Sequence, residues 1–249
     1  VGDASNDNDS TGYGGVGYDY HIGTYEVTNS QYTAFLNAVA ATDKYNLYDS
    51  SMGDMPRGGI SRFGSSGGYS YSTRPDMANK PVNNVTFSDA ARFANWLMNG
   101  QPSGGQNENT TEDGFYTFNS KDNITGQASH SGNQVNGTDW VAVASEDEWY
   151  KAAYYDGNSG YALYPTQSDS TPDKAKANST GDVKNPGENV ANYDGRADWN
   201  GQTNGNVTTV GSAQAESYYG TFDQGGNVFE WTDTSEGDER VFRGGHFNG

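Results

Sequence analysis

The sequence predicts an α+β fold in which about three helices and several short strands are separated by long loops. Three segments combine a capping residue with helical apolar spacing, and five short segments are apolar or alternating. Residues 43–80, 100–114, 120–138 and 156–218 show neither pattern. Only 32% of the 249 residues are hydrophobic, whereas aromatic residues reach 13%. The expected core is therefore thin and built mainly from rings.

The three helices are expected where a capping hydroxyl precedes an acid or amide by three residues. These capping pairs are Thr28 with Gln31, Thr86 with Asp89, and Ser145 with Glu148. The apolar stripes that follow are Tyr32, Phe35, Leu36 and Val39, then Ala90, Phe93, Ala94 and Leu97, then Trp149, Ala152 and Ala153.

Short strands are expected over residues 24–28, 115–119, 139–144, 228–233 and 240–245, which alternate or run apolar. No linker divides the chain, so we expect a single domain over residues 1–249.

The charge and composition exclude several classes of protein. Fourteen Lys and Arg against 32 Asp and Glu give a formal charge of −18, which argues against a nucleic-acid partner. No run of 18 apolar residues is present, so no membrane span is expected. The absence of cysteine excludes disulfides and thiolate metal sites within this chain. A loop-rich secreted domain without disulfides needs another stabilising element, and an acidic, oxygen-rich chain suits calcium.

The motifs of common enzymes are missing or incomplete. His21, His130 and His246 are far apart in the sequence, and no GxSxG nucleophile turn is present. Glu230 stands between Phe229 and Trp231 in "GGNVFEW". A carboxylate buried there needs a partner, which could be a cation, backbone amides or an arginine.

Six segments together resemble the formylglycine-generating enzyme family, also called the sulfatase-modifying factor domain. They are "YEVTNSQYTAFL", "KPVNNVTFSDAARFANWL", "ASEDEWYKAAYY", "ANYDG", "YGTFDQGGNVFEWTD" and "RVFRGG", in that order. The resemblance covers about residues 19–249 and is closest to secreted bacterial members. It implies a variant of the C-type lectin-like fold with small antiparallel sheets, a few helices and long loops.

The resemblance also implies two calcium sites. The first would use the side chains of Asp223 and Glu230 and the carbonyl groups of Gly226 and Val228. The second would use Asn192 and the carbonyl of Tyr193, with Asn204 and Asn206 as a gapped match to the remaining ligands. An amide in place of a carboxylate would make the second site weaker.

This chain differs from the family's enzymes at the catalytic cysteines, because it contains no cysteine. Family enzymes oxidise a substrate cysteine with two cysteines of their own, which bind copper, and the first would fall near Gly249. A closing strand would follow the last residue, so the domain is expected to be truncated at its C-terminus.

The leading hypothesis is a non-catalytic, secreted, calcium-stabilised structural or binding module with a protein or glycan ligand. Such a module could form homo-oligomers or filaments by strand exchange at an open sheet edge. One alternative is a metal-dependent oxidase of the sulfatase-modifying type. The other is a lectin-like protein that displays variable residues near its C-terminal "RGG".

Overall fold

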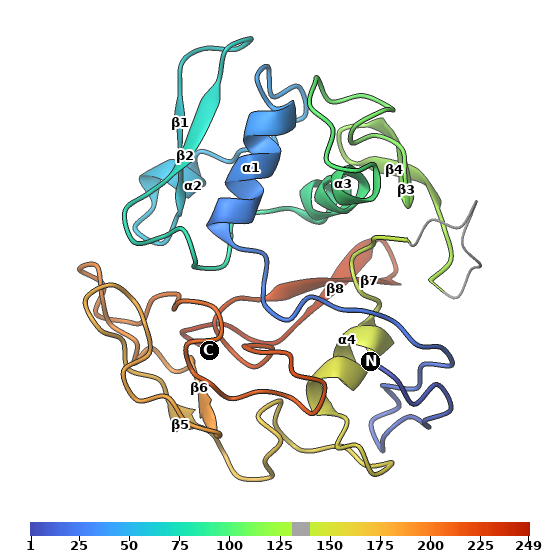
Figure 1. The fold of residues 1–249 in the computed structure, drawn as a ribbon, viewed down its shortest axis with the longest axis vertical. Coiled ribbons are helices and arrows are strands. Elements are labelled where there is room, and N and C mark those ends of the chain that lie inside the picture. The colour runs from blue at the N-terminus through green and yellow to red at the C-terminus, as the bar shows by residue number, and fades with distance from the viewer. Residues whose placement is uncertain (131–139) are drawn as a thin grey trace. The chain divides into compact units, whose positions relative to one another are not determined.

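A computed structural model describes residues 1–130 and 140–249 of the chain (Figure 1). The chain divides into two compact units. The first contains residues 1–28, 79–81 and 144–249, and the second contains residues 29–78 and 82–143. The single domain expected over residues 1–249 stays a prediction.

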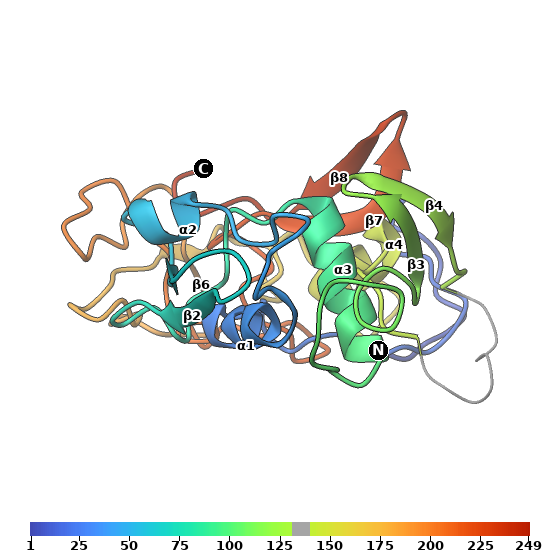
Figure 2. The same cartoon turned by 90° about the horizontal axis from the view of Figure 1, so that it is seen from above.

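In its described residues, the second unit holds three helices and two antiparallel hairpins. Helix α1 contacts strand β2, and α3 contacts both α1 and β3, an arrangement that Figures 1 and 2 show from two directions. The elements are α1 (Asn29–Val39), α2 (Ser51–Asp54), β1 (Ile60–Phe63), β2 (Ser70–Thr73), α3 (Phe87–Met98), β3 (Tyr116–Ser120) and β4 (Asn123–Gln127).

The core of this unit is aromatic, as the composition predicts. The whole expected stripe of α1, from Tyr32 to Val39, is buried. The Phe35 ring lies 5.3 Å from the ring of Tyr32 and 5.3 Å from that of Trp96 in α3, a spacing typical of aromatic pairs. Rings from two helices therefore fill the space that aliphatic residues occupy in most cores.

Helix α3 is buried over a wider face than its apolar stripe predicts. Arg92 is fully buried, where its guanidinium donates to both oxygens of Glu112 at 2.7 and 2.9 Å. The Arg92 guanidinium also lies over the Phe118 ring at 4.0 Å. Pairing on its polar side lets this helix bury charge as well as apolar surface.

The first unit holds one helix, two short strand pairs and most of the irregular chain. Its elements are α4 (Glu146–Tyr154), β5 (Asp173–Lys174), β6 (Val190–Ala191), β7 (Glu230–Glu236) and β8 (Glu239–Arg243). Helix α4 contacts β7. Strands β7 and β8 form an antiparallel hairpin, whereas β5 and β6 pair in parallel.

The capping boxes of α3 and α4 are confirmed, with Thr86 and Ser145 each bonded reciprocally to the residue three positions on. The strands expected over 115–119, 228–233 and 240–245 correspond to β3, β7 and β8, with ends that differ by at most three residues. The strand expected over 24–28 is wrong: only Thr28 forms an isolated bridge, with Pro81.

The strand expected over 139–144 is also wrong where it is described. Residue 139, like residues 131–138 of the loop expected over 120–138, falls outside the described residues, and 140–144 form no strand. The described part of that loop contains β4 (Asn123–Gln127), which the sequence did not predict. The amide of Val143 instead donates to the Tyr116 hydroxyl. The loop expected over 43–80 contains α2, β1 and β2. Each of these elements has only four residues, too few to show a helical or alternating apolar pattern.

The fold class is α+β, as expected, with helices and two-stranded sheets separated by long loops. The lectin-like relationship stays a prediction. Among the described residues, none of the helices has the length and apolar character that crossing a membrane requires.

Candidate metal site

The first unit contains three acidic side chains whose charges affect one another, Glu26, Asp223 and Glu230. We call these three residues the carboxylate cluster. Each residue is only partly buried as a whole, but the carboxylates point inward and are held by neutral donors. Glu230 Oε2 accepts from Trp149 Nε1 at 2.8 Å, and Asp223 Oδ2 accepts from the Gly211 amide at 2.5 Å. No lysine or arginine forms an ion pair with the cluster in the described part of the chain.

Glu230 carries the most direct sign of a missing partner. Its Oε1 atom is buried and has no hydrogen-bond partner among the described residues. The arginine considered as a partner does not reach it: Arg243, opposite Glu230 in the β7–β8 register, bonds to Glu146 instead. A buried carboxylate oxygen without a donor is costly, so this atom is suited to a cation.

The 226–228 turn, which precedes β7, offers carbonyl oxygens beside the cluster. Gly226 has a φ of 106°, and a Cβ at this position would lie 2.3 Å from the Asn192 carbonyl oxygen. Only glycine fits there. The Asn227 carbonyl accepts from the Phe247 amide at 2.9 Å. Among the described residues we find no donor to the carbonyls of Gly226 and Val228, the two expected to bind calcium.

Burial changes the acidity of the cluster. It raises the pKa of Asp223 from 3.8 to about 6, and raises the pKa of Glu230 from 4.5 to about 7, to which the charge of Asp223 adds. Burial, followed by the charges of Asp223 and Glu230, raises the pKa of Glu26. Without a cation, ionising all three groups at neutral pH is therefore unfavourable.

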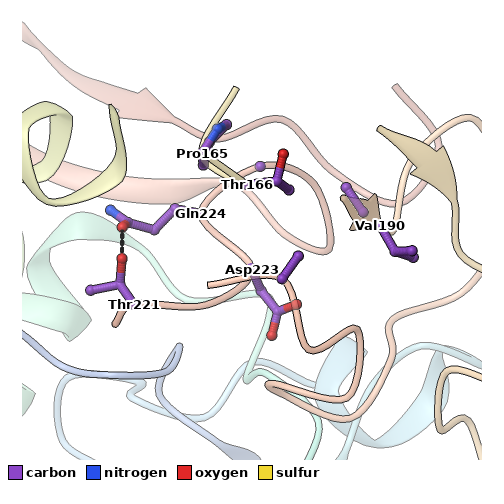
Figure 3. A pocket seen from close by; sticks show the side chains of 9 residues that line it. Pro165, Thr166, Val190, Thr221, Asp223 and Gln224 are labelled. Carbon is purple, nitrogen blue, oxygen red and sulfur yellow. Dashed lines mark hydrogen bonds between the residues drawn. The ribbon is translucent and has the colours of Figure 1, made fainter. Parts of the chain in front are cut away.

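A small cavity of about 10 Å³ borders Asp223, large enough for about one water-sized sphere. Figure 3 shows Asp223 at this cavity, together with Pro165, Thr166, Val190 and the hydrogen-bonded pair Thr221 and Gln224. The lining of this cavity does not include Glu230, Gly226 or Val228, and its volume suits a single water and excludes an organic ligand.

The described residues contain no group of three or more His, Asp or Glu side chains that could hold one metal ion. Calcium does not require such a group, because it accepts carbonyl and water oxygens beside one or two carboxylates. Asp223 and Glu230 with the two free carbonyls are a set of this kind. The residues therefore fit calcium better than a transition metal.

The expected ligands of the second site are only partly brought together. The buried Asn192 donates to the Asn206 carbonyl at 2.9 Å, while Asn192 Oδ1 and Asn206 Nδ2 are buried without partners among the described residues. Tyr193 uses its hydroxyl to donate to the Pro172 carbonyl. Asn204 is exposed. The Thr208 hydroxyl also accepts a hydrogen bond from Asn192, so Thr208 belongs to this group although the sequence did not predict it.

Three further residues of the site were not expected from the sequence. Glu26 bonds to the 226–228 turn, Asn227 forms the centre of that turn, and Trp149 binds Glu230. The only sequence signal for Glu26 was its position between Tyr25 and Val27, which resembles that of Glu230 between two rings.

The histidines do not gather into a site. His21 is exposed, the His130 ring contacts Phe115 at 4.9 Å, and the His246 ring contacts Phe229 at 4.7 Å.

Comparison with known proteins places the chain in a family. The family described as the sulfatase-modifying factor enzyme 1-like domain matches residues 15–249. The chain belongs to this family. The match extends over both units and includes every residue of the carboxylate cluster.

No curated protein matches the chain. Among solved structures, this sulfatase-modifying factor-like chain is similar to the protein in "Crystal Structure of CarF", with 22% sequence identity. The alignment covers 92% of this chain and 77% of that chain, with a TM-score of 0.47.

Proposed function

We propose that this chain is a non-catalytic, calcium-stabilised module that acts outside the cell as a structural or binding unit. The observation that carries the proposal is the buried, unpartnered Glu230 Oε1 beside Asp223 and the free carbonyls of Gly226 and Val228. Calcium at this position would give those oxygens a partner and offset the repulsion within the cluster. Extracellular calcium modules bind with dissociation constants on the order of 10⁻⁴ to 10⁻³ M.

Calcium is proposed to act on stability. An ion that binds only the folded chain stabilises it by about 2.7 kcal/mol when its concentration is a hundred times the dissociation constant. The first unit has few long elements, so a link between its loops would have a large effect. Thermal unfolding of chelated and calcium-loaded protein tests this directly. A hundredfold excess over those dissociation constants corresponds to about 10–100 mM calcium. A melting temperature that does not change at these concentrations would contradict the proposal.

The absence of cysteine supports the non-catalytic role. With no cysteine in its 249 residues, this chain lacks the thiolate pair with which the enzymes it resembles hold Cu(I). The purified chain is therefore expected to leave a cysteine-containing peptide unchanged in the presence of copper, a thiol reductant and oxygen. Mass spectrometry would detect conversion of the cysteine to an aldehyde, and turnover above a protein-free control would refute this role.

Strand addition provides a way for such modules to assemble. Every sheet among the described residues has two strands, so each of those strands has one edge outside its own sheet. Edges of this kind accept strands from other chains. Electron microscopy of purified protein with calcium is expected to show oligomers or filaments that a chelator disperses. Isolated monomers under both conditions would remove the assembly role.

A further inference from the structure

Glu26 approaches the carboxylate cluster from a distant part of the sequence, 201 positions before Asn227. Its backbone lies between the exposed residues Tyr25 and Val27. Its carboxylate accepts from Asn227 Nδ2 at 2.8 Å with one oxygen and from the Val228 amide at 3.3 Å with the other. Both bonds fall on the turn whose carbonyls are the expected calcium ligands.

These two bonds fix the orientation of the 226–228 turn. Asn227 has a φ of 57°, a left-handed conformation that needs support from its surroundings. Its side-chain oxygen accepts from the Thr208 amide at 2.8 Å and from Asn192 Nδ2 at 3.0 Å. Glu26 is thus the charged end of a buried hydrogen-bond network, and the carbonyls on either side of Asn227 are left available.

The charge of Glu26 acts on the same site. The donors to the cluster are an indole, an amide side chain and backbone N–H groups, all neutral. A divalent ion on Asp223 and Glu230 would balance the negative charges of these two side chains. The negative charge of Glu26 would remain unbalanced. A third carboxylate close to the ion, but outside its ligands, increases the attraction for the cation.

We propose that Glu26 is a positioning residue of the calcium site, which orients the 226–228 turn and adds a third negative charge without binding the ion. The inference rests on the proposed calcium site. Nothing in the first unit except Glu26 joins a carboxylate to the side chain of Asn227 in the described residues.

Terbium luminescence provides the test, because the Trp149 indole binds Glu230 directly and can sensitise an ion held there. The full-length chain is stripped of metal and titrated with terbium, which calcium then displaces. Glu26→Gln is expected to weaken calcium binding at least tenfold, while the metal-free variant still folds and unfolds in a cooperative thermal transition. Glu188→Gln, at an exposed glutamate of the same unit, is the matched control and should bind as the wild type does.

Glu26→Asp separates position from charge. It keeps the charge but is one methylene shorter, so it should also bind calcium more weakly than the wild type. Wild-type affinity in Glu26→Asp would refute positioning, and wild-type affinity in Glu26→Gln would refute the whole inference. A Glu26→Gln chain that fails to fold without metal would also contradict it. If the wild type itself binds no ion, the calcium proposal fails instead.

Discussion

Without calcium, the stability of the chain should fall as the pH rises from about 5 to 8. Burial raises the pKa of Asp223 from 3.8 to about 6 and that of Glu230 from 4.5 to about 7. Between these limits the folded chain holds protons that the unfolded chain has lost. The stabilising contribution of these two protonated groups is therefore fully present below about pH 4. This contribution is lost as the pH rises through 6 and 7.

The size of the effect follows from the two shifts. One pKa unit corresponds to about 1.4 kcal/mol, so each group contributes roughly 3 kcal/mol when fully ionised. The two groups interact, which makes a total of about 3 to 6 kcal/mol a reasonable range. Calcium should reverse the trend, because the ion binds the ionised carboxylates and competes with protons.

Urea unfolding of metal-free protein at several pH values measures this dependence. The free energy of unfolding should decrease between pH 5 and 8 without calcium and should not decrease with it. Glu230→Gln should reduce the slope of the metal-free curve, because only Asp223 of the two groups then remains. Glu188→Gln should leave the slope unchanged. A metal-free curve that is flat or rises over this range, in both the wild type and Glu230→Gln, would refute the reasoning.

Three substitutions test other parts of the structure. Gly226→Ala places a methyl group 2.3 Å from the Asn192 carbonyl oxygen and should lower both metal-free stability and calcium affinity, as seen by calorimetry; unchanged affinity would refute the close contact. Glu112→Gln leaves the buried Arg92 without its charged partner and should cost about 3–5 kcal/mol in urea unfolding; a cost below about 1 kcal/mol would contradict that pairing. Thr86→Ala removes the cap of α3 and should cost about 1 kcal/mol, whereas Thr86→Ser should restore it.

The features that the sequence predicts best are local. A capping box needs only residues three positions apart, so the starts of α3 and α4 could be read directly. The stripe of α1 was equally clear because its four apolar residues, Tyr32, Phe35, Leu36 and Val39, recur at helical spacing and are all buried. Local signals failed for β1 and β2, because these four-residue strands, ISRF and SYST, are too short to show a periodic pattern. Ile60 and Tyr71 anchor the hairpin in the core through contacts that form only in the folded chain.

The candidate site depends on long-range contacts, and these explain what the sequence did not predict. "DQGGNVFE" places Asp223 and Glu230 near one turn, so both could be named from a single segment. Glu26 could not, because its partners lie some 200 residues later and become neighbours only in the folded chain. The burial of Arg92 also depends on a partner, Glu112, that lies outside its helix.

Calorimetric titration of calcium into the metal-free chain at neutral pH tests the central claim most directly. At least one ion should bind to the wild type, with a dissociation constant on the order of 10⁻³ M or lower, and Glu230→Gln should lose this binding. No binding in the wild type, together with the same melting temperature in calcium and in chelator, would contradict the account.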